Sequence, residues 1–437
     1  MVKNATQNRP RFSQTNEPLK IVVEGVGDVV ENYYGPAFEV LKKKLQGKRE
    51  IQVTFVDDRQ YWKRDANLSQ KMQGIIASVE HWGAEYLDKS KPEDFRTYSK
   101  FLQADVVIIA TPDFTHGNIA TEWLKRNPPP EQIFIEKPLD SSLDAARTLL
   151  GKIKPYDNRV LAFDHYRARL LPTRDQMNVI LGFLGEGLTR FTFYFLEDHS
   201  GGDPKFHPLF QRDGPLENEQ RVKALQQGVI LDGMPHMIAL LAHFCRGETL
   251  RVTKVQAGQY IGVDGNSKKR TEVEKETFAG VEFVCADYQG HLVAGNAYVG
   301  KGVRGVEELG PEYDYNVKLL VIEGLNGNKV CFDLRSSGPG ASEAQLIDKN
   351  GKTQFWFKLN PKPYETFLEK VADGIYLDDR VALHVETGKR ILEILEDMRH
   401  PIPDKNEIPE YPCGMKNVRP SLYLEKILDA LPMLYGY

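Results

Sequence analysis

Short apolar runs alternate with amphipathic stretches over the first third of the chain. Runs that begin at Leu19, Ile51, Ala104 and Gln132 have the length and composition of buried strands. Helices are predicted between them at 36–46 and 116–126, and residues 60–100 are long enough to contain an extra helix. Because parallel strands need crossover helices on both faces, this alternation predicts a Rossmann-like α/β domain with a parallel sheet at residues 19–160.

Residues 161–400 have a different pattern, illustrated by LTRFTFYFLED at 188–198, whose aromatic and β-branched residues are typical of a sheet. Further strands are predicted at 251–262, 278–286, 290–299, 317–323, 329–334 and 343–348, and helices at 174–182, 362–374 and 380–399. The pattern predicts an α+β domain with a large, mostly antiparallel open sheet. Because exposed apolar residues on an open sheet are usually buried by another surface, we expect a homo-oligomer whose subunits pack against each other through this sheet.

Three polar segments lie outside these predicted elements. Residues 1–18 are predicted to be a flexible N-terminal segment, and the Pro-rich residues 401–437 a tail that packs on the surface. Residues 197–225 are rich in turn residues, which predicts a long loop or lid. Either His199, Asp203 or His207 contacts the substrate from this lid, or the lid closes without contacts.

Composition narrows the class of partner. A chain of 437 residues predicts two domains and a cleft, and a net charge of −4 with scattered Lys and Arg argues against nucleic acid. No apolar run is long enough to span a bilayer. The four cysteines are far apart without a C-x-x-C pair, which argues against a zinc knuckle or disulfide scaffold and for a reducing cytoplasm. We therefore expect a cytoplasmic protein that binds a small molecule and no metal.

The segment VVEGVGDVVENYY predicts a dinucleotide site. Gly25 and Gly27 suit the tight turn that lets the backbone approach a pyrophosphate, with Asp28 opening the helix whose N-terminus binds it. Val30 departs from the fingerprint, which has Gly or Ala there. The alternative is an ordinary βα turn.

The residues after the second strand bear on the choice of cofactor. Asp57 or Asp58 would bind the adenosine ribose, which favours NAD. Arg59 beside them could instead bind the 2′-phosphate of NADP, so NADP is the alternative cofactor.

Two further strand ends point into the same crevice. ATPDFTH places Thr111 and Pro112 at the carboxyl edge of the predicted sheet, with His116 either near the cofactor or serving only to start a helix. EKP places Glu136 and Lys137 at the same edge, and the following proline favours an extended backbone at Lys137. A cation there can stabilise the oxygen of a substrate as hydride leaves, although a surface lysine at a strand end is an equal alternative.

DGMPH forms a second cluster of polar groups. Asp232 and His236 are four residues apart and share one face if the segment is helical. Because proline is tolerated only in the first turn of a helix, Pro235 predicts that Asp232 lies at or near the N-cap. His236 is then either a general base oriented by Asp232 or an ordinary helix histidine.

Together these motifs resemble the Gfo/Idh/MocA family of nicotinamide-dependent oxidoreductases, over about residues 19–395. The resemblance rests on Gly-x-Gly, ATPDFTH, EKP and DGMPH in that order. It implies NAD or NADP as cofactor, a sugar, cyclitol or related polyol as substrate, and Lys137, Asp232 and His236 as catalytic groups.

The DHY triplet in AFDHYRARLLP looks like the phosphate region of glucose-6-phosphate dehydrogenase. His165 and Tyr166 with Arg167 or Arg169 would then bind a substrate or its phosphate. In the alternative reading, Asp164 and Tyr166 are hinge packing and only an arginine reaches the substrate. A sugar-phosphate dehydrogenase, a non-catalytic NAD(P)-binding regulator and a metal-assisted hydrolase are the competing functions.

Overall fold

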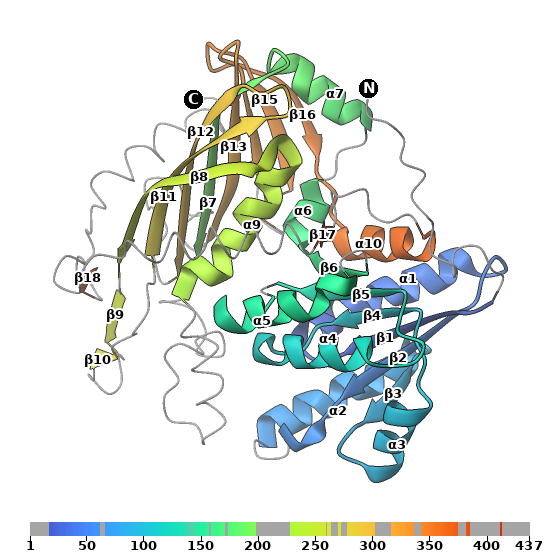
Figure 1. The fold of residues 1–437 in the computed structure, drawn as a ribbon. Coiled ribbons are helices and arrows are strands. Elements are labelled where there is room, and N and C mark those ends of the chain that lie inside the picture. Colours follow the sequence, from blue (N-terminus) through green and yellow to red (C-terminus); the bar gives the residue numbers. More distant parts are fainter. Residues whose placement is uncertain are drawn as a thin grey trace. The chain divides into compact units, whose positions relative to one another are not determined.

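The sheet of the first domain contains six parallel strands, which confirms the predicted parallel sheet and adds two strands to the four that the sequence pattern predicts (Figure 1). The computed structural model describes residues 17–61, 66–137, 139–140, 143–156, 159–170, 174–197, 228–258, 260–263, 270–271, 278–301, 316–335, 342–374, 382–384 and 411–412. The parallel strands are β1 (Leu19–Glu24), β2 (Ile51–Asp57), β3 (Glu85–Asp88), β4 (Val106–Ile109), β5 (Gln132–Glu136) and β6 (Val160–Phe163). Their order, β6-β5-β4-β1-β2-β3, reverses between β1 and β4, the position where open α/β sheets bind ligands.

Helices connect these strands at nearly the predicted positions. They are α1 (Gly35–Leu45), α2 (Ala66–His81), α3 (Pro92–Lys100), α4 (His116–Leu124), α5 (Leu143–Ile153) and α6 (His165–Leu170), with the π-helical segment η2 (Val30–Tyr34) and the 3₁₀ segments η3 (Arg59–Tyr61), η4 (Asp113–Thr115) and η5 (Lys154–Tyr156). The predicted long crossover at 60–100 contains two helices and also β3, a strand that the sequence pattern did not predict.

The two faces of this sheet carry different side chains. Phe55 of β2 packs on Phe38 of α1, with ring centroids 6.0 Å apart. Val23 is the register partner of Phe55, so the next residue, Glu24, points to the opposite face. There its carboxylate accepts a hydrogen bond of 2.7 Å from the indole of Trp123 in α4. The sheet is therefore covered on both sides, as a doubly wound fold requires.

A late segment of the chain returns to the Rossmann domain, which differs from the predicted second domain of 161–400. Helix α10 (Pro363–Ala372) packs on β5 and β6 through Phe367, whose ring lies 4.9 Å from Phe134 and 4.1 Å from Phe163. The strand β17 (Ala382–His384) pairs antiparallel with β6. The helix predicted at 380–399 is wrong at these three residues, since they extend a sheet whose edge strand offers free backbone groups.

The second domain is built on an eight-stranded sheet, which is antiparallel apart from one pair, β12 with β7. Its strands in sheet order are β16 (Thr353–Lys358), β15 (Glu343–Ile347), β14 (Lys329–Asp333), β13 (Asn316–Gly324), β7 (Leu188–Glu197), β12 (Leu292–Lys301), β11 (Phe278–Asp287) and β8 (Cys245–Gly258). A small sheet contains β10 (Arg270–Thr271), β9 (Tyr260–Val263) and β18 (Tyr411–Pro412). The predicted mostly antiparallel sheet is confirmed.

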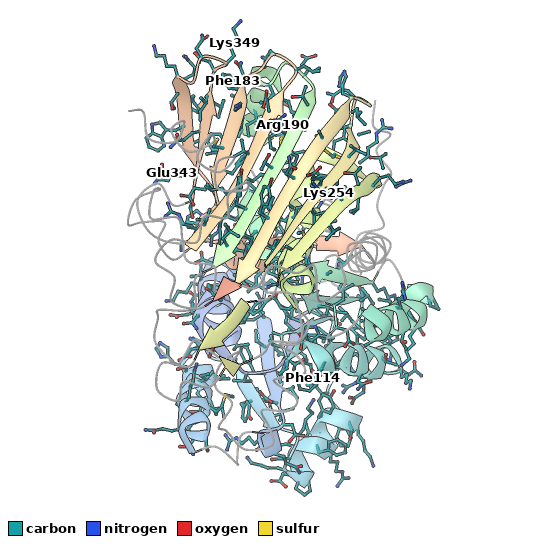
Figure 2. The ribbon with its side chains drawn as sticks, turned by 90° about the vertical axis from the view of Figure 1, so that its left-hand side faces the viewer. Phe114, Phe183, Arg190, Lys254, Glu343 and Lys349 are labelled. Atoms are coloured by element: carbon teal, nitrogen blue, oxygen red, sulfur yellow. The ribbon has the colours of Figure 1, made fainter. Side chains whose placement is uncertain are left out.

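Helix α9 (Gly228–Phe244) packs on one face of the large sheet, and α7 (Arg174–Phe183) precedes β7. Phe195 of β7 contacts α9, so residues of β7 that alternate with it, such as Arg190, point to the other face. Figure 2 views this other face, with Arg190, Lys254 and Glu343 labelled on three of its strands. Arg190 and Lys254 are exposed on this face, whereas Tyr194 and Cys331, which point to it as well, are buried.

Contacts between residues divide the described chain into two units. The first contains the residues up to Ala168 together with those from Lys362 to His384, and the second contains those from Arg169 to Pro361 with residues 411–412. The predicted N-terminal segment, most of the predicted lid and most of the predicted tail lie outside the described residues.

Candidate active site

The glycine turn after β1 has the geometry of a phosphate cradle. Gly25 has a φ of +97°, and a Cβ atom on it would lie 2.8 Å from the carbonyl oxygen of Ala110, so only glycine fits. A Cβ on Gly27 would meet no atom within 4 Å, which leaves open space above the backbone. The helical segment that starts at Asp28 presents its N-terminus beside this space. The turn therefore fits the pyrophosphate of a dinucleotide.

The helix after this turn contains a π-bulge, which sequence reasoning missed. Residues Val30–Tyr34 form the π-helical segment η2, and α1 continues from Gly35. Val30, which departs from the fingerprint, is completely buried. Close packing occurs instead at Gly35, where a Cβ atom would lie 2.2 Å from the Trp82 ring. Asp28 is largely exposed and forms an ion pair with Lys71.

Acidic side chains surround the end of β2. Asp57 accepts a hydrogen bond of 2.7 Å from the backbone N–H of Val26 in the glycine turn, and its other oxygen accepts one of 2.6 Å from the N–H of Asp58. Arg59 lies 3.4 Å from the carboxylate of Asp88 at the end of β3. Asp57 thus ties the end of β2 to the turn, and Arg59 already has an acidic partner.

Asp88 is held in its charged form. Burial acts to raise its pKa, but hydrogen bonds from Ser90 and Arg59 outweigh this effect and hold the pKa below its ordinary value. The guanidinium of Arg59 also lies over the ring of Tyr86, 5.3 Å from its centroid. These contacts fix Arg59 between Asp88 and Tyr86.

The loop after β4 is held by its own side chains. His116 begins α4, is 1% exposed, and its Nε2 lies 2.8 Å from the carbonyl oxygen of Thr111. The hydroxyl of Thr115 donates to the hydroxyl of Thr111 at 2.7 Å. Pro112 is exposed at the end of this strand. These contacts give His116 a role in fixing the Thr111 loop.

Glu136, the last residue of β5, is buried against the helix that follows the glycine turn. The hydroxyl of Tyr34 donates a hydrogen bond of 2.7 Å to Glu136 Oε1. Lys137 follows directly and is half-buried. An ionisable pair therefore lies at the carboxyl edge of β5, two strands from the glycine turn of β1.

Burial raises the pKa of Glu136 from 4.5 to about 7, against the hydrogen bond from Tyr34 and the positive charge of Lys137. Because this folded-state pKa is higher than that of the unfolded chain, the contribution of Glu136 to stability is greatest below about pH 4.5. That contribution falls as the pH rises through about 7, by roughly 3 kcal/mol in total. Near neutral pH the carboxyl therefore lies close to its midpoint, where nearby groups decide its charge.

The DHY triplet lies at the end of β6. Asp164 is buried and accepts a hydrogen bond of 2.9 Å from the N–H of Arg167 in the first turn of α6. The ring of His165 lies 4.1 Å from that of Tyr166 and 6.0 Å from that of Tyr364 in α10. The triplet therefore packs beside the end of β5, with α10 as a neighbour that the sequence pattern did not reveal.

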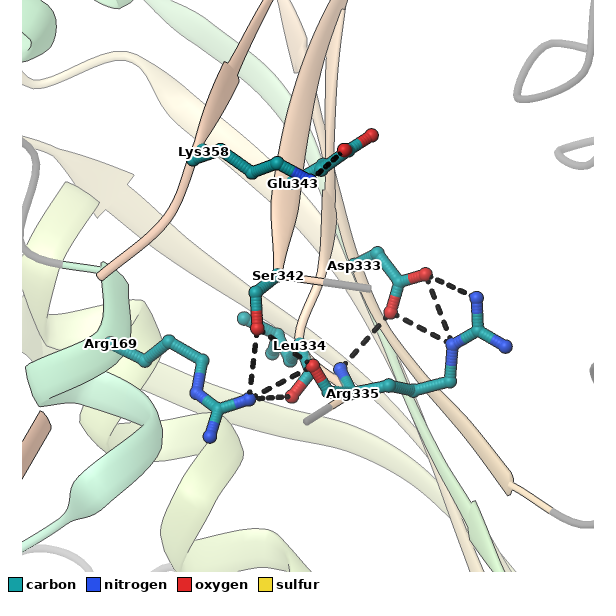
Figure 3. Close-up of polar contacts among 7 residues, drawn as sticks. All are labelled: Arg169, Asp333, Leu334, Arg335, Ser342, Glu343 and Lys358. Atoms are coloured by element: carbon teal, nitrogen blue, oxygen red, sulfur yellow. Dashed lines mark hydrogen bonds and ion pairs between the residues drawn. The ribbon is translucent and has the colours of Figure 1, made fainter. Parts of the chain in front are cut away.

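Arg169 is engaged within the second unit. Its Nη1 donates hydrogen bonds to the carbonyl oxygens of Leu334 at 3.1 Å and Arg335 at 2.9 Å, and lies 3.2 Å from the hydroxyl of Ser342 (Figure 3). Asp333 forms a buried ion pair with Arg335 in the same region. Arg169 therefore anchors the end of β14, which weakens its candidacy as a phosphate ligand, and Arg167 is also buried.

Helix α9 carries the second predicted cluster. The prediction that Asp232 caps this helix is wrong, because α9 begins at Gly228 and Pro235 lies inside it. A Cβ on Gly233 would lie 2.8 Å from Val299, so packing of α9 on the sheet offsets the lost proline hydrogen bond. His236 is 1% exposed, with its ring 5.2 Å from that of Phe195. The side chain of Asp232 lies outside the described part.

Residues 20–163 match the family model described as "Oxidoreductase family, NAD-binding Rossmann fold", that of the Gfo/Idh/MocA proteins. The N-terminal domain thus matches the NAD-binding domain of this oxidoreductase family. The Gfo/Idh/MocA domain contains the glycine turn, the Thr111 loop and Glu136–Lys137, so the chain carries the NAD-binding domain of an oxidoreductase. No curated protein matches the chain.

Two solved structures show the same two-domain fold. An NAD-binding oxidoreductase from Klebsiella pneumoniae is 15% identical with a TM-score of 0.60, and the match covers 87% of this chain and 96% of that chain. A 3-ketoreductase from Actinomadura kijaniata, in complex with NADP and TDP-benzene, is 14% identical with a TM-score of 0.56, covering 91% and 99%.

Among the described residues, no helix has both the length and the apolar character needed to cross a membrane. No group of three or more His, Cys, Asp or Glu side chains among them is arranged to hold a metal ion.

Proposed function

We propose that the protein transfers a hydride between a nicotinamide cofactor and a hydroxyl or keto carbon of a sugar, cyclitol or related polyol. The observation that carries this proposal is the placement of Glu136–Lys137 at the carboxyl edge of the sheet whose β1 turn fits a dinucleotide. The 3-ketoreductase with the same fold, crystallised with NADP and TDP-benzene, supports a substrate with an oxidisable hydroxyl carbon.

The roles proposed for the side chains follow from their chemistry. In the oxidative direction His236 accepts the hydroxyl proton while the ammonium of Lys137 stabilises the oxygen. The C–H bond breaks and its electron pair leaves as hydride, so that the carbon becomes a carbonyl. The cofactor supplies the hydride acceptor when it is bound. Asp232 is proposed to orient His236, and His165 and Tyr166 to contact the substrate.

The test is a nicotinamide absorbance assay with NAD and NADP across sugars, cyclitols and their phosphates. Turnover of an unphosphorylated polyol supports the proposal, and turnover restricted to phosphates would replace it with a sugar-phosphate dehydrogenase. Cofactor binding without turnover of any compound would favour the non-catalytic regulator. Failure to bind either cofactor would contradict all three functions.

We propose NAD as the preferred cofactor. Asp57 ends β2 and Asp58 follows it, and the charge of Arg59 is balanced by Asp88. An additional phosphate on the ribose would meet this acidic surface, where Arg59, the arginine that the described residues place there, is already paired with Asp88. NADP, which is bound by the structurally similar 3-ketoreductase, is expected to bind here more weakly than NAD.

Replacing Asp88 with asparagine is expected to improve NADP binding by about three- to tenfold and to leave NAD binding nearly unchanged. The substitution removes the charge that pairs with Arg59 while keeping an acceptor for Ser90. Fluorescence titration with NADPH and NADH measures both affinities. Glu93→Gln, which removes an exposed charge from nearby α3, is the control. An equal gain in both variants would assign the effect to overall charge.

We propose that the chain forms a homo-oligomer through the sheet face opposite α9. One row of register partners on that face contains Thr192, Val321, Cys331, Gln345 and Trp356, and the indole of Trp356 is 56% exposed at the edge. Sedimentation equilibrium is expected to give more than one subunit, and Val321→Lys, on strand β13 of the row, is expected to shift the protein toward monomer. A wild-type monomer at all concentrations would contradict this proposal.

A further inference from the structure

The hydrogen bond between Tyr34 and Glu136 joins two segments that sequence reasoning did not connect. Tyr34 is completely buried, Glu136 is 8% exposed, and the hydroxyl-to-carboxylate distance is 2.7 Å. Because both groups are removed from water, the bond is strong and its loss would leave the carboxylate without this donor. The bond links the helix that follows the glycine turn directly to the residue before Lys137.

The π-bulge places Tyr34 on this face. Val30, Tyr34 and Phe38 are all completely buried, and the extra residue of the widened turn keeps them aligned toward the sheet. Gly35 allows Trp82 to approach the helix backbone, since a Cβ there would lie 2.2 Å from the ring. Packing thus stabilises the π-helical turn, and this turn places the Tyr34 hydroxyl within hydrogen-bond distance of the Glu136 carboxylate. Such bulges are frequent at functional sites.

Helix α10 closes the other side of Tyr34. The ring of Tyr364 packs edge-on against Tyr34 at 4.8 Å and stacks on Tyr33 at 4.9 Å. Burial, followed by the nearby charge of Glu136, raises the pKa of Tyr364 well above its ordinary value, so this phenol stays neutral. The same holds for Tyr34. Two neutral phenols therefore lie near Glu136.

Two charged groups also face Glu136. Lys137 favours the charged carboxylate and Asp164 disfavours it. Burial and Asp164 thus oppose ionisation, whereas Tyr34 and Lys137 promote it. Of the three groups that act on Glu136, Tyr34 is the uncharged one, and it lies on η2 rather than beside Glu136 in the chain. Removal of its hydroxyl therefore changes the ionisation of Glu136 without adding or deleting a charge.

We propose that Tyr34 is a positioning residue that favours the charged form of the Glu136 carboxylate, so that this carboxylate orients the Lys137 ammonium near neutral pH. The inference rests on the proposed function of Lys137. With Glu136 protonated, the Lys137 ammonium loses the attraction of the neighbouring negative charge. Activity therefore falls on the acid side as Glu136 takes up its proton.

The test is Tyr34→Phe, which keeps the ring and its packing. Carboxyl ¹³C NMR of the cofactor-free protein follows the titration of Glu136, assigned by the signal that Glu136→Gln lacks. The pKa of Glu136 is expected to rise by about one pH unit in Tyr34→Phe, and the acid limb of the kcat/KM profile by the same amount. Tyr33→Phe removes a neighbouring, half-exposed hydroxyl and is expected to change neither.

The two arms separate the possible failures. An unchanged Glu136 titration in Tyr34→Phe would overturn the proposal whatever the activity. A raised titration with an unmoved acid limb, or an equal loss of activity at every pH, would overturn the link to Lys137 and leave a structural bond. Absence of turnover in the wild-type protein would count against the proposed function, and the NMR arm would still decide whether Tyr34 controls Glu136.

Discussion

Replacing Lys137 with methionine is expected to lower kcat by a factor on the order of 10² to 10³ and to leave NADH affinity unchanged. Lys137 directly follows β5 at the carboxyl edge of the sheet, where ligands bind in this class of fold. Methionine keeps the apolar stem and removes the ammonium. The loss corresponds to roughly 3 to 4 kcal/mol of transition-state stabilisation. Steady-state kinetics and NADH fluorescence titration measure the two quantities.

The same substitution at Lys125 is the matched control. Lys125 is exposed at the end of α4 and lies in the same domain, so Lys125→Met changes the net charge equally. It is expected to keep wild-type kcat. If Lys137→Met keeps it as well, Lys137 is a surface lysine at a strand end, and the mechanism proposed for the site is wrong. A parallel loss of NADH binding would instead assign Lys137 to the cofactor.

The Rossmann domain could be predicted because its signals are local. Each buried strand is a short apolar run, and the glycines, acids and Lys-Pro pair follow the strands directly, so the strand order alone brings them to one edge. Gly25 illustrates the point: its positive φ and its contact with Ala110 are consequences of the tight turn that the sequence already predicts.

The contacts that tune the site could not be predicted, because they join residues that are far apart in the chain. Tyr364 reaches Tyr34 across more than 300 positions, through a helix that was assigned to the other domain. The Arg59–Asp88 pair depends on β3, a strand of four residues hidden in a helical crossover. In both cases the sequence shows a residue type that can form the contact, but it does not show which distant residue is its partner.

Pro235 shows how tertiary packing can override a local rule. Proline inside a helix costs about 3 kcal/mol or more, so sequence reasoning placed the start of the helix just before it. In the structure α9 runs on both sides of Pro235, and its residues from Gly233 to Leu241 are buried. Burial of this many apolar side chains exceeds the cost of one lost hydrogen bond. The position of His236 within the helix therefore follows from packing.

Replacing His236 with asparagine is expected to lower kcat by a factor on the order of 10² to 10⁴, the range for loss of a general base. His236 is 1% exposed and its ring lies 5.2 Å from that of Phe195 in a tilted arrangement, so packing holds the imidazole in one orientation. Asparagine fits the space and keeps a polar group, but it cannot accept the hydroxyl proton. Kinetics in both reaction directions measure the loss, because the group that accepts the proton in oxidation must return it in reduction.

A second histidine on the same helix separates catalysis from folding. His243 lies seven residues further along α9 and is 8% exposed, so His243→Asn makes the same change in a similarly buried place. We expect His243→Asn to affect thermal stability at least as much as His236→Asn while keeping near wild-type kcat per folded molecule. If the two variants lose activity in proportion to their stability, His236 is a packing residue, and the proton acceptor must be sought elsewhere. If His236→Asn alone loses turnover and still binds NADH, the proton-transfer role follows.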